Sequence, residues 1–233
     1  MCFYVAKSDF LLYNEKRTKQ WEEYLMPRPA YDNVQESLLT ACTKLFLSEG
    51  IRETEMQQIA VHAGISRSTL YRYVNDKDQL VFMVATDLMY RTVNRCVSVS
   101  TESQQNGLEK LRHFCHTFAA ELTGMPGLVR FLSEIKLIYG ARPAETPEAK
   151  MYTEGVSRLL HREAQFLFEG LSDGSIRCLE DPMGFISLLI HTIHGLATCT
   201  LASEMYNGTI YTTSNLEEIN RTVDILLDSI RAV

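Results

Sequence analysis

Basic and hydroxyl-bearing side chains are concentrated in one short segment of the N-terminal third of the chain. If the segment is a helix, with about 100° between successive residues, four of these side chains share one exposed arc. The four residues of this arc are Arg67, Ser68, Tyr71 and Arg72. Guanidinium and hydroxyl groups so arranged can hydrogen-bond base edges and phosphate oxygens. The segment therefore predicts a surface that binds double-stranded DNA.

Each side chain of the segment has an expected partner on the DNA. Arg67 can pair with guanine edges, and Ser68 and Thr69 can bond bases or phosphates. The residues expected to contact phosphates or sugars are Tyr71, Arg72 and Tyr73. Asp76 can cap the next helix, and Lys77 in its first turn is expected to hold a phosphate.

Capping residues mark the helices that position this surface. Thr54 is expected to cap a helix over residues 55 to 62, and Ser66 a second over 67 to 74. Thr54 and Ser66 are also candidate DNA contacts. Gly64 lies between the two helices, where the chain needs a positive φ to leave the first one. The pattern predicts a helix, a turn and a helix.

The remaining chain favours an all-α fold, because apolar residues recur every three or four positions. The long alternation of β-branched and polar residues that is typical of strands is missing. About nine helices are expected in total. Besides the two above, they cover residues 34 to 50, 76 onward, 105 to 122, 126 to 140, 146 to 172, 183 to 206 and 216 to 231. Glycines and prolines separate these segments.

Three parts follow from this pattern. Residues 1–30 lack clean periodicity and form an N-terminal extension, with Met26 as an alternative start. Residues 31–78 are expected to be a three-helix helix-turn-helix domain that binds DNA. Residues 79–233 are expected to be a larger helical bundle for ligand binding and dimerisation.

Composition limits where and how such a chain acts. Its 23 lysines and arginines face 29 aspartates and glutamates, so DNA binding requires a local basic patch. The six cysteines include no CxxC pair, which favours free thiols in a reducing cytoplasm. Lys7 and Asp9 interrupt the N-terminal apolar stretch, so we expect no export. The uncharged stretch 183–203 is expected to be a buried helix rather than a membrane span.

Residues 38 to 82 resemble the tetracycline-repressor (TetR) family of bacterial one-component regulators. The matching residues are Leu38, Leu39, Ala41, Leu45, Phe46, Gly50, Thr54, Ile59, Ala60, Ala63, Gly64, Ile65, Ser66, Thr69, Leu70, Tyr71, Arg72, Tyr73, Lys77 and Leu80. Three positions depart from the family pattern, namely Glu55 for threonine, Ser68 for glycine or alanine, and Val74 for phenylalanine.

The resemblance implies a ligand-responsive transcriptional regulator, in this case a repressor released from its operator by a small-molecule effector. It also implies a homodimer formed by the last two helices and an effector pocket between about Asn106 and Gly174. Candidate pocket residues are the aromatic, methionine and histidine side chains of the middle helices. They are Phe114, Phe118, Phe131, Tyr139, Met151, Tyr152, Phe166 and His191, and a residue of this kind is more often a plain core residue than a ligand contact.

Two alternatives remain. Glu55, Val74 and the acidic charge are compatible with a helical ligand- or protein-binding module whose head no longer reads DNA. The pairs His113/His116 and His191/His194 have a spacing that a metal can use, but no thiol or carboxylate shares their face nearby. We therefore expect no metal and no cofactor. Known catalytic motifs are missing, scattered carboxylates suit solvated helix faces, and we expect no enzyme.

Overall fold

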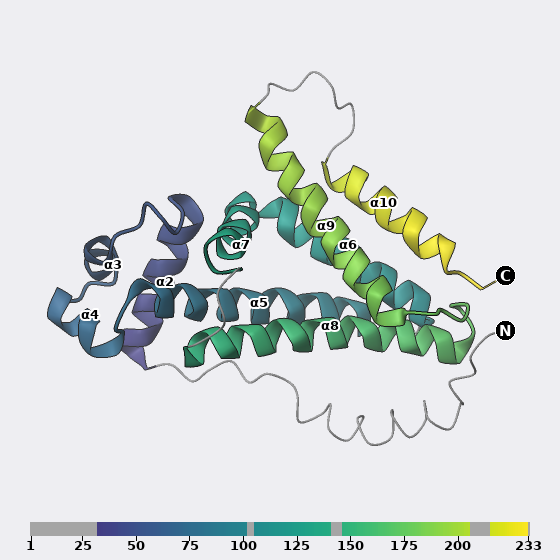
Figure 1. Ribbon diagram of the computed structural model, residues 1–233, viewed down its shortest axis with the longest axis horizontal. Coiled ribbons are helices and arrows are strands. Elements are labelled where there is room, and N and C mark those ends of the chain that lie inside the picture. The colour runs from purple at the N-terminus through teal and green to yellow at the C-terminus, as the bar shows by residue number, and fades with distance from the viewer. Residues whose placement is uncertain (1–31, 102–104, 141–145, 206–214, 233) are drawn as a thin grey trace. The chain divides into compact units, whose positions relative to one another are not determined.

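Nine helices make up the part of the chain that the computed structural model describes, which is residues 32–101, 105–140, 146–205 and 215–232 (Figure 1). They are α2 (Asn33–Ser48), α3 (Met56–His62), α4 (Arg67–Tyr73), α5 (Lys77–Thr101), α6 (Gly107–Gly124), α7 (Pro126–Tyr139), α8 (Pro147–Asp173), α9 (Pro182–Met205) and α10 (Asn215–Ser229). The all-α prediction is confirmed, and each expected helix is present. The expected extension 1–30, with Met26, lies outside the described residues.

Helix α2 has a capped start and ends next to Gly50, within two residues of the expected range. The Asp32 carboxylate accepts hydrogen bonds from the backbone N–H groups of Val34 and Gln35, each at 2.9 Å. After α2 the chain turns at Gly50, whose φ of +100° favours glycine. The buried face consists of Leu38, Leu39, Ala41, Cys42, Leu45 and Phe46. Helix α3 packs on this helix, and α4 packs on α3.

Helices α2, α3 and α4 form the helix-turn-helix unit, and α5 joins this unit to the rest of the chain without a break. Every residue from Leu80 to Leu88 is buried, because α2 covers one side of the helix and α6 and α8 cover the others. Buried apolar residues from Leu38 to Ile230 form one continuous core. The expected boundary at residue 78 therefore falls within continuously packed structure, and it stays a prediction.

The C-terminal helices form layers around α5 and α8, which lie side by side (Figure 1). Helices α6 and α8 approach closely where Gly107 meets Gly170, since a Cβ on Gly107 would lie 2.0 Å from the Gly170 nitrogen. The Arg112 guanidinium of α6 holds α10 through Asp224 and Asp228.

Helix α9 is apolar along most of its length. Its segment Pro182–Cys199 is long and apolar enough to cross a membrane by length and composition, and 22% of that segment is buried. One such helix is weak evidence for a membrane span. Here α9 packs against α6, α7, α8 and α10, and the side that remains uncovered is apolar, with Leu188 48% exposed.

Candidate nucleic-acid interface

The start of α3 differs from the expectation. Its N-cap is Glu55 rather than Thr54, and the Gln58 side chain accepts a hydrogen bond from the Glu55 N–H at 2.7 Å. Thr54 is fully buried, and its hydroxyl donates to the Gly50 carbonyl at 2.7 Å. The predictions that Thr54 caps α3 and contacts DNA are therefore wrong. Its hydroxyl holds the turn after α2 instead.

The turn between α3 and α4 has the expected geometry. Gly64 has a φ of +68°, and the N–H of Ile65 donates to the Ala60 carbonyl at 3.0 Å, which closes the end of α3. The Ser66 hydroxyl accepts a hydrogen bond from the Thr69 N–H at 3.0 Å. The predicted Ser66 cap is confirmed, and it fixes the residue at which α4 begins.

Helix α4 presents the predicted arc to solvent. Arg67, Ser68, Tyr71 and Arg72 are all exposed, while Leu70 on the opposite side is fully buried. The Arg67 guanidinium lies 5.7 Å from the centre of the Tyr71 ring, within the range of a cation–π contact. This contact aligns the Arg67 side chain along the exposed face. Val74 is 8% exposed and packs in the core. Although valine replaces the phenylalanine of the family pattern here, the side chain still anchors the end of α4.

The other candidates on α4 are less available than Arg67. The Ser66 hydroxyl lies 2.8 Å from the hydroxyls of both Ser68 and Thr69, so these three groups form a small network at the start of the helix. Contact with DNA would require them to exchange these partners. Tyr73 is partly buried and packs against the core, so its predicted phosphate contact has only part of the ring available.

Lys77 has a structural role that the sequence did not indicate. Its amine donates to the carbonyls of Ile51 and Thr54 at 2.7 and 3.0 Å, and lies 3.4 Å from the Arg52 carbonyl. An ammonium group has three protons to donate, and here they meet the loop between α2 and α3. The predicted phosphate clamp is corrected accordingly. Asp76 caps α5 as expected, since its carboxylate accepts from the Gln79 N–H at 3.0 Å.

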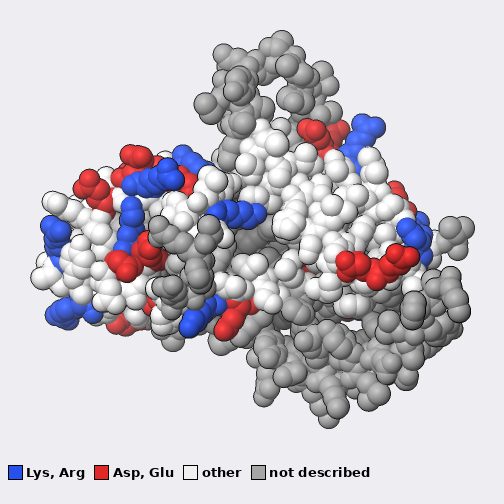
Figure 2. Space-filling model, viewed as in Figure 1, with Lys and Arg blue, Asp and Glu red and all other residues white. Residues whose placement is uncertain are grey.

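Charges of both signs surround the exposed arc. Figure 2 shows blue and red side chains interleaved over the end of the molecule that carries α3 and α4. Glu55 is exposed on this end. Arg67 and Arg72 supply exposed positive charge on α4, which agrees with the local patch that the acidic composition requires.

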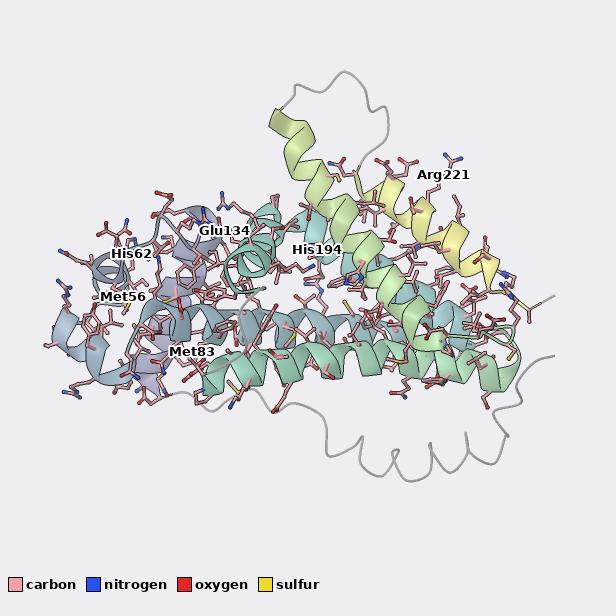
Figure 3. The ribbon with its side chains drawn as sticks, in the orientation of Figure 1. Met56, His62, Met83, Glu134, His194 and Arg221 are labelled. Carbon is pink, nitrogen blue, oxygen red and sulfur yellow. The ribbon has the colours of Figure 1, made fainter. Side chains whose placement is uncertain are left out.

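Helix α7 holds the loop and the end of α2, and the sequence did not reveal this contact. The Glu134 carboxylate accepts a hydrogen bond from the Ile51 N–H at 2.5 Å, and the Arg130 guanidinium donates to the Leu47 carbonyl at 2.6 Å. Figure 3 shows Glu134 on the side of α7 that faces this unit. A Cβ on Gly127 would lie 2.4 Å from the same Leu47 carbonyl. We call Gly127, Arg130 and Glu134 the α7 clamp.

Two further hydrogen bonds tie the start of α5 to the bundle. The Tyr139 hydroxyl of α7 donates to the Asp78 carboxylate at 2.7 Å, and the Gln79 amide donates to the Glu148 carboxylate of α8 at 3.2 Å. These partners are separated by more than sixty residues in sequence. A shift of α7 or α8 would therefore be transmitted to the first turn of α5, immediately after α4.

The predicted ligand residues fall into separate groups. Phe114 and Phe166 form a buried ring pair 6.1 Å apart, whereas Phe131 stacks on Phe46 of α2 at 5.9 Å. Tyr139 and Tyr152 both lie against Phe82, at 4.9 and 5.9 Å. Among the other candidates, Phe118 is buried in the core, Met151 is half-buried on α8 and His191 is exposed on α9. Six of the eight candidates belong to the continuous core or pack against it, and whether they line a ligand site stays a prediction.

The histidine pairs do not converge on a metal site. The His116 ring nitrogen lies 3.0 Å from the Asp224 carboxylate, and the His194 ring lies 3.5 Å from the Lys136 amine. Burial, with smaller contributions from the charges of Lys136 and His191, lowers the pKa of His194 to about 4. Within the described ranges, no group of three or more His, Cys, Asp or Glu side chains could hold a metal ion.

Two carboxylates correct the expectation that acidic side chains occupy solvated helix faces. Asp87 of α5 is 1% exposed and pairs with Arg91 at 2.8 Å. Glu163 of α8 is also 1% exposed, and burial raises its pKa well above the usual value. Both occupy positions at which the apolar spacing of their helices would place a hydrophobic residue. That signal was present in the sequence.

Comparison with known proteins agrees with this geometry. Residues 38–84 match the family model of the bacterial regulatory proteins of the tetR family. The HTH-type transcriptional regulator HbdR of Aromatoleum sp. (strain CIB) is 28% identical over 86 residues, which are 37% of this chain and 37% of that protein. The match to this curated relative thus spans little more than a third of its length.

Solved structures extend the likeness to the bundle. The regulator FadR from Bacillus subtilis, in complex with stearoyl-CoA, superposes with a TM-score of 0.66 at 18% identity, over 84% of this chain and 99% of that one. The ketosteroid regulator KstR2 of Mycobacterium tuberculosis gives a TM-score of 0.58 at 17% identity, over 88% and 97%. At these identities the likeness concerns the fold. With its matching segment over residues 38–84, its exposed α4 and the helical fold of its described residues, this chain is similar to the TetR-family regulators, and the family match itself is confined to the helix-turn-helix segment.

Proposed function

We propose that this chain is a homodimeric cytoplasmic repressor that leaves its operator when a small-molecule effector binds in the helical bundle. The observation that carries the proposal is the face of α4. Arg67, Tyr71 and Arg72 point to solvent from a short helix that Leu70 anchors and Ser66 starts. Such a helix fits the major groove with its N-terminal residues at the base edges.

Dimerisation supplies the second reading helix, because one helix covers too few base pairs. Two such helices must lie about 34 to 36 Å apart to enter successive major grooves. The uncovered apolar side of α9 and the neighbouring α10 provide a surface for a second copy, with Leu188 48% and Ile225 64% exposed. Figure 2 shows a largely uncharged surface over α9, with acidic and basic side chains toward the two ends of α10. A two-fold axis would pair this face with itself.

The α7 clamp supports a route from effector to DNA. Glu134 and Arg130 hold the backbone of the α2 end and the following loop, and the same helix contacts α9 and α6 in the bundle. A ligand that displaces α7 would therefore move the helix-turn-helix unit and change the spacing of the two α4 helices. Since an effector acts only through different affinities for two states, it must bind the displaced state more tightly.

The structural relatives support an apolar class of effector. The FadR structure contains stearoyl-CoA, and KstR2 is described as a ketosteroid regulator. Both share the bundle of this chain, and the inner surfaces of α6 and α8 here are lined by aromatic and aliphatic side chains. We therefore propose that a largely apolar small molecule is the effector.

A selection from a randomised duplex library tests the proposal. The full-length protein should enrich a two-fold symmetric sequence and bind it as a dimer, with an affinity that falls steeply as salt rises. Arg67→Ala should relax preference at one base pair by about 1 to 3 kcal/mol. Arg72→Ala should weaken all sequences alike and reduce the salt slope by about 1. Enrichment of no sequence would indicate a module whose head no longer reads DNA.

A further inference from the structure

Glu163 occupies a core-facing position of α8 that its neighbours fill with apolar or small residues. The inward stripe of this helix follows the three- and four-residue spacing of a buried face. Its members are Ala149, Tyr152, Val156, Leu160, Glu163, Leu167 and Gly170. Glu163 is 1% exposed. Its carboxyl group is therefore enclosed in the junction of α8 with the helices that pack against it, which are α5, α6 and α9.

Neither carboxyl oxygen of Glu163 has a hydrogen-bond partner among the described residues. Burial raises the pKa of the group well above its usual value, and so favours the neutral, protonated carboxyl. A buried polar group without a partner lowers the stability of the folded chain, whereas an apolar residue of similar size would not. A structural role gives no reason for a carboxyl at this position.

The surroundings of Glu163 are neutral. Burial raises the pKa of Cys96 of α5 to about 12, with the charge of Glu121 and then that of Glu163 contributing in the same direction. Burial likewise raises the pKa of Cys115 of α6, with Glu163 again contributing. Both thiols are therefore protonated. Glu121 forms an ion pair with Arg95 at 2.9 Å, so its charge is balanced.

One turn beyond Glu163, the aromatic pair of Phe114 and Phe166 continues the same junction between α6 and α8. The junction therefore combines one buried acid, whose neutral form burial favours, with two protonated thiols and aromatic rings. A carboxylic acid can donate one hydrogen bond and accept another. It matches a ligand group that is itself uncharged and that offers an acceptor or both an acceptor and a donor.

We infer that Glu163 is the polar anchor of the effector site, and that the effector is an uncharged, mainly apolar molecule with a hydroxyl or carbonyl group. This inference rests on the proposed ligand-responsive function and specifies its ligand. A cationic ligand would require Glu163 to ionise in a low-dielectric junction, and an anionic ligand would meet the same acidic group without a free cation nearby among the described residues.

Amphiphiles with one alkyl chain and different head groups test the charge preference. The probes are decan-1-ol below its solubility limit, and decanoate and decyltrimethylammonium below their micelle concentrations, each titrated calorimetrically into the full-length protein at pH 7. Decan-1-ol should bind, and the two charged probes should bind at least about tenfold more weakly, because a lost or unmatched buried hydrogen bond changes affinity by about that factor. Tighter binding of either ion, or no binding of decan-1-ol, would overturn the inference.

Variants of Glu163 test the residue itself. Glu163→Leu should unfold at a higher temperature than the wild type and lose decan-1-ol affinity about tenfold. Glu163→Gln, which keeps a donor and an acceptor, should retain most of the affinity and is informative even if the leucine variant does not fold. Glu154→Gln is the matched control on the exposed side of α8.

The outcomes separate the inference from the function on which it rests. Unchanged decan-1-ol affinity in Glu163→Leu, or loss of stability in that variant with recovery in Glu163→Gln, would show a structural carboxyl and refute the anchor. If the wild type selects an operator while decan-1-ol binding ignores Glu163, the inference fails and the regulator function stands. If no duplex is selected, the regulator function fails whichever amphiphile binds.

Discussion

Replacing Gly127 by alanine should weaken the packing of α7 on α2. A Cβ at this position would lie 2.4 Å from the Leu47 carbonyl oxygen and 3.1 Å from both its carbonyl carbon and its Cβ. The oxygen belongs to the backbone at the end of α2, so no side-chain rotation can relieve the contact. The same oxygen also accepts a hydrogen bond from Arg130 at 2.6 Å, which any retreat of α2 would lengthen.

The size of the effect follows from these distances. An ordinary contact begins at 3.4 Å, so α7 and α2 must separate by about 1 Å, and such overpacking costs about 1 to 3 kcal/mol. Alanine in a helix gains up to about 1 kcal/mol over glycine. Gly124→Ala is the matched control, because a Cβ at Gly124, the last residue of α6, meets no atom within 4 Å. Both variants replace a helical glycine by alanine, so comparing their unfolding free energies cancels most of the gain in helix propensity.

Urea unfolding of the two variants measures the difference. We expect Gly127→Ala to be less stable than Gly124→Ala by about 1 to 3 kcal/mol, and to bind the selected operator more weakly, because the helix-turn-helix unit is displaced. Equal unfolding free energies would refute the close contact. Lower stability with unchanged operator affinity would refute the role of the α7 clamp in transmitting the effector signal.

Three further predictions concern other parts of the chain. Lys77→Met should lower the free energy of unfolding, measured with urea, by about 1.5 to 3 kcal/mol, because the loop carbonyls lose a charged hydrogen-bond donor. If the variant binds DNA more weakly but unfolds with an unchanged free energy, Lys77 contacts a phosphate as first predicted. His194 should make the wild type less stable as the pH falls from 6.5 toward about 4. These are the ordinary pKa of a histidine and the pKa of His194 in the folded chain. Between them the unfolded chain binds the proton and the folded chain does not, so protonation favours unfolding. Thermal unfolding of His194→Asn at pH 7 and pH 5 should show a smaller loss, and an unchanged loss would exclude His194 as its source. Leu188→Glu should convert the proposed dimer to monomers, as measured by light scattering. Leu137→Glu, at a leucine that is 80% exposed on α7, should leave the dimer intact. A monomeric wild type would contradict the assignment of the α9 face as the dimer interface.

Local patterns predicted most of the DNA-binding unit correctly. The Ser66 and Asp76 caps, the positive φ of Gly64 and the exposed arc of α4 depend on residues within a few positions of one another. Helix periodicity and capping chemistry act over the same range, which is why the sequence indicates them. The Thr54 prediction failed by one residue, because the chain enters α3 at Glu55 and buries the threonine to close the preceding turn.

The grouping of candidate residues into an effector site stays a prediction. Aromatic residues of the middle helices were grouped by type, but their partners come from different helices, so Phe131 packs on α2 and His191 faces solvent. Glu163 was passed over although its position on the apolar stripe was visible, because most helix carboxylates are solvated. Whether a carboxyl at such a position has a hydrogen-bond partner depends on the side chains that α5 and α6 bring to it. The residue spacing within α8 carries no information about those side chains.

The sequence by itself determined the nine described helices, the helix-turn-helix and the side chains available to read DNA, because these depend on contacts within one or two turns. The tertiary structure decided how that unit is held. The α7 clamp joins residues 83 positions apart, Lys77 reaches back to the loop after α2, and Glu163 is left without a partner among the described residues. Hydrogen bonds and burial at such separations follow from how helices pack, which no local spacing specifies.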